Sequence, residues 1–237
     1  MKIILLMLII MSIIIITSCV SMNSIKGSGK IVSEDREFTN FNSIKLLGSI
    51  DVTINYSDNY NCTVRGDDNL ISFIKTEVVN NNLQISINKS YSTTEGLVVN
   101  VNAQEYDEVS ISGSGDINII DFKNETLSLN INGSGDITAN GEVNTLFAKI
   151  SGSGDIISTE LKSKSVTITI NGSGDAKIWA SDSISVKING SGDIEYYGNP
   201  TNVESKINGS GELLKNSHLW RLWFGGKTIN QGVKWRN

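Results

Sequence analysis

The sequence predicts an all-β fold, a parallel β-helix (a solenoid) whose coils are about 19 residues long. Three observations indicate this fold: a six-residue phrase recurs six times, its copies are evenly spaced, and each copy ends a stretch in which apolar and polar residues alternate. One coil of this size cannot bury its apolar residues, whereas stacked coils bury them between one another.

The repeated phrase consists of Ile, then Ser or Asn, then Gly, Ser, Gly and an acid. Its copies occupy residues 111–116, 131–136, 150–155, 170–175, 188–193 and 207–212. The first glycines of successive copies are 20, 19, 20, 18 and 19 residues apart. A fixed period in this range is typical of stacked repeat architectures.

Each repeat is expected to contain two strands and two turns. Apolar residues before the phrase occupy every second position, as in Val166, Ile168 and Ile170, which is the pattern of a strand with one buried face. The two glycines bend the chain, since glycine tolerates positive φ, and an apolar residue such as Ile156 then starts a short strand. The alternative is an antiparallel meander with the phrase as a hairpin loop. The solenoid is favoured, because the turns vary in length while the strands do not.

Residues 1–18 are predicted to be a lipoprotein signal peptide. Lys2 precedes an uncharged apolar run over residues 3–16, which is short for a membrane span and typical of a signal-peptide core. The run ends in Ile16-Thr17-Ser18-Cys19, which resembles the lipobox of bacterial lipoproteins. This resemblance implies lipid on Cys19 and an exported protein anchored in the bacterial cell envelope, on its periplasmic or outer-surface face. The alternative is an ordinary secretory signal with an incidental cysteine.

Residues 19–30 are small and polar and predict a flexible tether, followed by the β-helix domain at 31–212. Its first half, 31–105, is irregular, and its second half, 106–212, holds the regular repeats. Strands in the first half are expected at 43–56, 61–65, 70–79, 83–88 and 97–102. The stretch Leu47-Gly48-Ser49-Ile50-Asp51 is a degenerate copy of the phrase, so the core is expected to start there. Cys62 is expected to be a small buried hydrophobe.

Several motifs of the first half lead in a fixed order into the glycine-rich array. They are Phe-Asn-Ser-Ile at 41–44, Gly-Ser-Ile-Asp-Val-Thr-Ile at 48–54, Val-Arg-Gly-Asp-Asp-Asn-Leu-Ile at 64–71 and Leu-Gln-Ile at 83–85. This ordered set resembles the auto-transporter adhesin head domain family (the GIN domain, DUF2807) over residues 38–212. The resemblance implies a right-handed parallel β-helix in exported, often lipid-anchored envelope proteins with an adhesin-like role. It supplies no catalytic residue.

Residues 213–237 differ from the rest of the chain. They contain five basic residues and no acid, and three of the four tryptophans: Lys215, Arg221, Lys227, Lys234, Arg236, Trp220, Trp223 and Trp235. A solenoid needs its last coil covered, which favours a C-terminal cap. The alternative is a basic aromatic tail that contacts membrane headgroups or a partner.

The sequence favours a binding or structural protein over an enzyme. Its one histidine, His218, lies in the tail, and it has no phosphate-binding loop, dinucleotide fingerprint or Cys/His metal cluster, so no cofactor and no metal are expected. A formal charge of −5 argues against nucleic acid as a partner. A polysaccharide-acting β-helix enzyme would need lysines beside the acids on one face. The available lysines are not expected to share one repeat position: Lys149, Lys164, Lys177, Lys187 and Lys206.

The candidate ligand or cation face is the column of acids that end the repeated phrases. Its members are Asp116, Asp136, Asp155, Asp175, Asp193 and Glu212. In register they lie about 4.8 Å apart, where each carboxylate either accepts hydrogen bonds from its own turn or helps to bind a cation such as Ca²⁺. The first interpretation is favoured.

A second polar column runs beside the acids. It consists of Ser112, Asn132, Ser151, Asn171, Asn189 and Asn208. Stacked amides can hydrogen-bond from coil to coil. Together with the serines at 134, 153, 173 and 191, these columns predict a flat polar face for an extended ligand, a glycan or a protein. A purely structural protein without a ligand is the remaining alternative.

Overall fold

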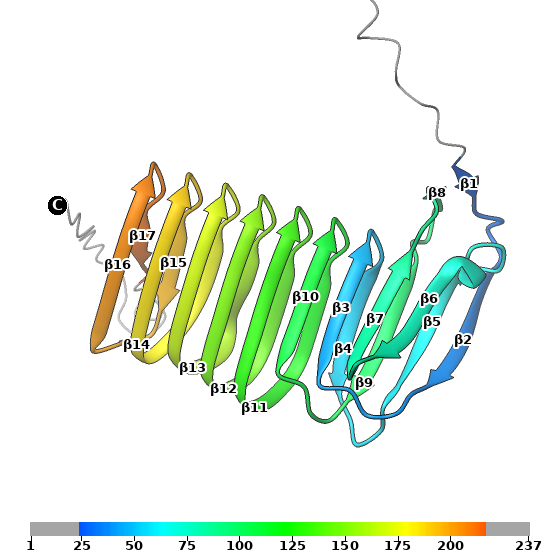
Figure 1. Ribbon diagram of the computed structural model, residues 1–237, viewed down its shortest axis with the longest axis horizontal. Helices are drawn as coiled ribbons and strands as arrows, with labels where there is room; N and C mark the ends of the chain where they lie inside the picture. The colour runs from blue at the N-terminus through cyan, green and yellow to red at the C-terminus, as the bar shows by residue number, and fades with distance from the viewer. Residues whose placement is uncertain (1–23, 217–237) are drawn as a thin grey trace, which may run out of the picture.

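The computed structural model describes residues 24–216, which form a flattened solenoid of β-strands (Figure 1). The strands are β1 (Ile25–Lys26), β2 (Ile31–Glu37), β3 (Ser43–Gly48), β4 (Asp51–Tyr56), β5 (Asn61–Asp67), β6 (Ile74–Val79), β7 (Asn82–Ile87), β8 (Tyr91–Ser92), β9 (Val98–Ala103), β10 (Glu108–Gly113), β11 (Ile117–Gly133), β12 (Ile137–Gly152), β13 (Ile156–Gly172), β14 (Ala176–Gly190), β15 (Ile194–Tyr197), β16 (Asn202–Gly209) and β17 (Leu213–Lys215). A short 3-10 helix, η2 (Ile71–Phe73), lies between β5 and β6.

Each regular coil contributes to two sheets. The long sheet runs β6-β7-β3-β10, then through the C-terminal parts of β11 to β14, and ends at β16. The short sheet runs β2-β5-β9-β4, then through the N-terminal parts of β11 to β14, and ends at β15 and β17. Between the sheets the chain turns at two places: the Gly-Ser-Gly corner, before each short-sheet segment, and a second corner, where β11 to β14 bend with a register shift.

Equivalent residues of successive coils pair in parallel, which confirms the solenoid and excludes the antiparallel meander for the repeats. Ile150, Ile170 and Ile188 pair in register, and each is 0% exposed. Similar columns fill the space between the two sheets with aliphatic side chains. Each such burial stabilises the fold by about 1.5–3 kcal/mol, so the core is a continuous stack.

The close stacking of coils explains the glycines of the repeated phrase. Gly172 has a φ of +145°, and a Cβ built on it would lie 2.1 Å from the carbonyl oxygen of Gly152 in the preceding coil. Gly174 would place a Cβ 2.0 Å from the carbonyl oxygen of Gly154. Neither distance is possible for a real carbon atom. The glycines are therefore required by the contact between coils as well as by the turn.

The order of coils in the stack differs from their order in the chain near the N-terminus. The coil made by β3 and β4 lies between the coil made by β7 and β9 and the coil that begins with β10 (Figure 1). Gly48 pairs with Gly113, so the degenerate phrase at residues 47–51 forms a Gly-Ser-Gly-type corner, as predicted. The inversion itself leaves no mark in the sequence period.

Antiparallel strands close the N-terminal end of the stack. On the short sheet β5 pairs antiparallel with β9 and β2 with β5, and on the long sheet β6 pairs antiparallel with β7. The edge strand β2 carries charged residues that are mostly exposed, and charges on an edge discourage pairing with another chain. The strand expected at 70–79 is wrong in its first half. There η2 forms a turn, closed by the bond from Phe73 N to Leu70 O, that carries the chain from one sheet to the other.

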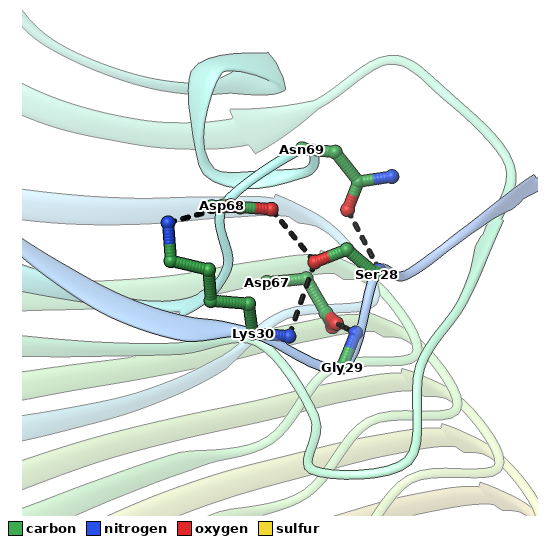
Figure 2. A network of polar contacts seen from close by, with 6 residues as sticks. All are labelled: Ser28, Gly29, Lys30, Asp67, Asp68 and Asn69. Atoms are coloured by element: carbon green, nitrogen blue, oxygen red, sulfur yellow. Dashed lines mark hydrogen bonds and ion pairs between the residues drawn. The ribbon is translucent and has the colours of Figure 1, made fainter.

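Hydrogen bonds fasten residues 28–30 to residues 67–69 (Figure 2). Asp67 is only 1% exposed. Its Oδ1 accepts a bond from the N–H of Gly29 at 2.6 Å, and its Oδ2 accepts one from the hydroxyl of Thr93 at 2.5 Å. Both carboxylate oxygens are therefore satisfied without a positive partner. The contact closes the same end of the stack as the antiparallel strands.

These contacts correct the prediction of a tether over residues 19–30. Ile25 and Lys26 form β1, which pairs in parallel with β8. Residues 25–30 are therefore part of the folded domain, because their backbone groups hydrogen-bond to the side chains of Asp67 and Asn69. Residues 19–23 of the predicted tether, with Cys19, lie outside the described residues, as does the signal peptide.

The C-terminal end of the stack is open in the part of the chain that the structure describes. Val203 and Ile207 on β16 are 40% and 39% exposed, although they pair with the buried Ile184 and Ile188 of β14. Residues 217–237, most of the predicted cap or tail, lie outside the described residues. Within 24–216, no helix combines the length and apolar character needed to cross a membrane.

Candidate functional site

The acids of the repeated phrase form a hydrogen-bonded series that we call the acidic ladder. In each coil the backbone N–H of the acid donates to Oδ1 of the acid in the preceding coil of the stack. The first of these six bonds is 3.2 Å long, and the other five measure 2.7–2.9 Å. The members are Asp51, Asp116, Asp136, Asp155, Asp175, Asp193 and Glu212.

The ladder exists because the corner leaves one backbone donor without a carbonyl. Around the corner of β13 and β14, Ser173 N bonds to Gly152 O at 2.9 Å and Ile156 N bonds to Asp175 O at 3.0 Å. The N–H of Asp175 lies between these bonds and receives its acceptor from the Asp155 side chain at 2.7 Å. A short side chain with an oxygen at the δ position is therefore needed in every coil.

This geometry corrects one expectation and adds one residue. The carboxylates were expected to accept bonds from their own turns, but the donor belongs to the next coil of the stack. Asp51 was missing from the predicted column. The degenerate phrase at 47–51 was the available signal, and only the stack order places Asp51 directly before Asp116.

The neighbouring polar column is in register as predicted. Asn208 Nδ2 donates to Asn189 Oδ1 at 2.9 Å, and Asn189 Nδ2 donates to Asn171 Oδ1 at 2.7 Å. These bonds confirm the amide stacking for the last three coils. In the earlier coils Ser112 and Ser151 alternate with asparagine, so two amides are never adjacent there.

The acidic ladder is a single file of carboxylates rather than a cluster. Among residues 24–216, no three His, Cys, Asp or Glu side chains lie close enough together to hold a metal ion. Calcium takes six to eight oxygen ligands, whereas neighbouring ladder carboxylates lie about one strand spacing, ~4.8 Å, apart. Their outer oxygens instead form a linear acidic ridge along the Gly-Ser-Gly corner.

The lysines are arranged differently from the expectation. Lys149, Lys187 and Lys206 share one column on the outer face of the long sheet, with Thr169 between the first two. A shallow hollow of about 360 Å³ lies there, beside the 47% exposed ring of Phe147. None of these three lysines takes part in an ion pair within residues 24–216. The column therefore adds a cationic, partly apolar surface that does not meet the acids.

A larger trough, of about 460 Å³, lies at the second corner of β11 to β14. Its walls carry alternating charges, because Lys123 pairs in register with Glu142 and Glu142 with Lys162. At one end the ammonium of Lys162 lies 4.8 Å from the centre of the half-buried Trp179 ring. We call this feature the second-corner trough. Nothing in the repeated phrase points to it.

Cys62 is a buried thiol and not part of either surface. It is 1% exposed, and burial raises its pKa to about 11, although the nearby Arg36 acts in the opposite direction. The thiol is therefore neutral at physiological pH and unsuited to nucleophilic chemistry. This agrees with the expectation of a small buried hydrophobe.

Comparisons with known proteins agree with this architecture. The family described as "Putative auto-transporter adhesin, head GIN domain" matches residues 40–200. The crystal structure of a putative adhesin from Bacteroides fragilis is 23% identical and has a TM-score of 0.65; the match covers 81% of this chain and 100% of that one. A second adhesin so described, from Parabacteroides merdae, is 22% identical over 81% of this chain and 99% of that one, with a TM-score of 0.54.

A third solved structure bears a different description. It is of a "Putative lipid binding protein" from Parabacteroides distasonis, which is 22% identical over 82% of this chain and 100% of that one, with a TM-score of 0.56. At these identities the structures show a shared fold. A search of the curated proteins finds no significant match.

Proposed function

Because this chain belongs to the auto-transporter adhesin head GIN domain family, we propose that it is a non-enzymatic, adhesin-like protein of the cell envelope that binds an extended ligand, a glycan or a protein. The observation that carries the proposal is the repetition of the same polar side chains, in register, along successive coils. A surface that repeats every ~4.8 Å matches a ligand that is itself a linear repeat.

Besides the second-corner trough, two polar surfaces are available for such a ligand. The ridge formed by the outer oxygens of the acidic ladder is one, and it is the surface we proposed from the sequence, through the acids at 116, 136, 155, 175, 193 and 212. The outer face of the long sheet, with Lys149, Lys187 and Phe147, is the other. Cation binding by the ridge is the weaker candidate, since each Oδ1 from Asp51 to Asp193 already accepts a backbone N–H.

We further propose that lipid on Cys19 anchors the chain. The proposal rests on the lipobox-like residues 16–19 behind the uncharged run, because two or more acyl chains hold a protein stably on a membrane. Wild-type protein is expected to partition into detergent, and a Cys19→Ala variant to be released or to remain unprocessed. A processed Cys19→Ala protein that still fractionates with membranes would refute the anchor.

Residues 217–237, the larger part of the segment 213–237 that was expected to form a cap or tail, are proposed to cover the open C-terminal end of the stack, since residues 213–215 form β17 in the last coil. Val203 and Ile207 on the last long-sheet strand are exposed apolar side chains that a further segment could bury. The segment after β17 carries the apolar residues Trp220 and Trp223. Removal of residues 217–237 is expected to increase the binding of a hydrophobic dye and to lower the melting temperature. A truncated protein that matches the full chain in both respects would favour the alternative of a tail that contacts membranes or partners.

Binding to immobilised glycans and extracellular-matrix proteins tests the central proposal. The soluble chain from residue 20 onward is screened beside a variant with Asp136, Asp155 and Asp175 all changed to Asn, which keeps the ladder acceptors and removes three charges of the ridge. Saturable binding of at least one extended polymer is expected. Absence of any binding by the folded chain would favour a purely structural role. Turnover of a bound polysaccharide would favour the enzyme alternative.

A further inference from the structure

The second-corner trough exists because the coils differ in length at this corner. In β13 eight positions lead from the buried Ser158 to the buried Val166, whereas in β14 only six lead from Ile178 to Ile184. The long-sheet and short-sheet segments themselves remain in register. The β14 corner is thus two residues shorter than the β13 corner, and Trp179 of β14 lines the trough beside it.

Three columns of side chains run along the trough, across the strands. The middle column points inward and forms the floor, where Val143 and Ser163 are buried. The outward columns on either side form the walls. They are Lys123, Glu142 and Lys162 on one side, and Glu125, Asn144 and Lys164 on the other. Across four strands the trough is about 14 Å long, so it fits a short run of a linear polymer.

The trough is positively charged although the chain is acidic. Its three lysines and two glutamates give a net charge of +1, against −5 for the whole chain. Within residues 24–216 the ion pairs are Lys30–Asp68, Arg36–Glu34 and Lys177–Glu195. None of the trough lysines is neutralised by one of these ion pairs; Lys162 Nζ donates a 3.4 Å bond to the carbonyl oxygen of Thr159, which leaves its charge available to an anionic ligand.

The aromatic end of the trough adds a second kind of contact. Lys162 and Trp179 lie together, with the ammonium 4.8 Å from the ring centre. The ammonium lies over one face of the ring, so a sugar contacts the remaining exposed part of Trp179 through its apolar C–H groups, and the ammonium binds an acidic substituent of the same sugar. Further along the trough Asn144 Nδ2 donates to Glu125 Oε2, and the other oxygens of this pair can accept from ligand hydroxyls.

We propose that the second-corner trough binds an anionic polysaccharide, with one sugar ring against Trp179 and with carboxylates of two of its sugars paired with Lys162 and Lys164. This inference rests on the proposed adhesin-like function and assigns its ligand class and its site. A protein partner is less suited, because the walls hold charged side chains where protein interfaces place an apolar centre.

Binding of polygalacturonate, a uronic-acid polymer, to the soluble chain from residue 20 onward tests the inference, with a neutral glucan of equal length as the second probe. We expect saturable, salt-sensitive binding of polygalacturonate and at least tenfold weaker binding of the glucan. The Lys162→Gln, Lys164→Gln double variant removes both charges while keeping polar side chains one atom shorter, and is expected to weaken polygalacturonate binding about tenfold, a change of 1.4 kcal/mol. Trp179→Ala is expected to weaken it similarly, and Trp179→Phe less.

Two controls separate the site from the rest of the molecule. Lys177→Gln removes a lysine outside the trough, and the Asp136, Asp155, Asp175 to Asn variant alters only the ridge; both are expected to bind polygalacturonate as well as wild type does. Equal melting temperatures show that each variant is folded. If polygalacturonate binds but the trough variants bind as wild type does, the inference is wrong while the proposed function stands. If the chain binds another polymer of the wider screen but not polygalacturonate or other uronic-acid polymers, the inference is also wrong.

Discussion

The two corners of each coil differ in how strictly their length and residues repeat. At the Gly-Ser-Gly corner six coils repeat the same residues, and the acid of each coil satisfies a backbone donor of the next. At the second corner six to eight positions join the buried residues on either side, and the side chains differ from coil to coil. Both corners belong to the same strands, so the difference is not one of fold.

This contrast separates what stacking requires from what it leaves free. The glycines at the first corner are required because a Cβ would lie about 2 Å from a carbonyl oxygen of the adjacent coil, and the acids are required by their hydrogen bonds to that coil, such as the 2.7 Å bond between Asp175 and Asp155. The second corner has no comparable contact in every coil, so charged and aromatic side chains can accumulate there without cost to stacking. Stacking therefore explains why the residues of the first corner are uniform, whereas the variable residues of the second corner are free to distinguish one ligand from another.

The largest effect is expected in the core just before the Gly-Ser-Gly corner. Ile170→Asp places a charge in the aliphatic stack between Ile150 and Ile188, and a buried unpaired charge costs about 3–5 kcal/mol or more. Denaturant unfolding should show this loss. The matched control is Thr169→Asp, which points outward between Lys149 and Lys187 and is expected to change stability by less than about 0.5 kcal/mol. Equal losses of stability in the two variants would mean that Ile170 does not point into the core.

The next largest effect compares the corners directly. Gly172→Ala would force a Cβ to within 2.1 Å of the Gly152 carbonyl oxygen at a φ of +145°, and such strain costs about 2–4 kcal/mol. Ser181→Ala at the second corner is expected to change the free energy of unfolding by less than about 0.5 kcal/mol. Thermal melting of both variants checks the pair. A tolerated Gly172→Ala would mean that the coils can separate locally.

A smaller effect is expected from the acidic ladder. Asp155→Ala removes the acceptor for the N–H of Asp175 and should cost about 1–2 kcal/mol, whereas Asp155→Asn retains an oxygen at that place and relieves repulsion between like charges. The asparagine variant is therefore expected to match wild type or to exceed it slightly in chemical denaturation. If asparagine were as damaging as alanine, the carboxylate charge rather than the hydrogen bond would hold the corner.

Calcium gives the smallest expected effect at the same corner. A ligand that binds only the folded state stabilises it by RT ln(1 + [L]/Kd), about 2.7 kcal/mol at a hundredfold excess over Kd. Oδ1 of each ladder aspartate is committed to a backbone donor and the outer oxygens form a single file, so millimolar Ca²⁺ is expected to leave the melting temperature unchanged. A saturable increase that Asp155→Asn weakens would instead support a cation site on the ridge.

The sequence predicted the repeating part of the solenoid well. It predicted the ends of the solenoid and the second corner of each coil poorly. The inward register of Ile150, Ile170 and Ile188 follows from a period and an alternation that stacking imposes on every coil. The position of the β3–β4 coil in the stack does not follow from this pattern, because a coil can lie at another place in the stack without any change in its own residues.

The same distinction applies to the candidate sites: the one that repeats could be predicted, and the one that does not repeat could not. The acidic column was visible in the sequence because it repeats, but its hydrogen-bond donors were assigned to the wrong coil. The second-corner trough was not visible in the sequence, because the residues that line it do not repeat from coil to coil. Lys123, Lys162 and Trp179 are brought together only by the pairing register of the strands and by the lengths of the coils.

Amide hydrogen exchange at residue 175 tests most directly whether the first corner is held together by its acids. The N–H of Asp175 bonds to Oδ1 of Asp155 and to no backbone carbonyl. Its protection is expected to fall at least tenfold in Asp155→Ala and to persist in Asp155→Asn, while the amide of Ser185 in the middle of the long sheet stays protected in both variants. Unchanged protection at residue 175 in Asp155→Ala would contradict the ladder.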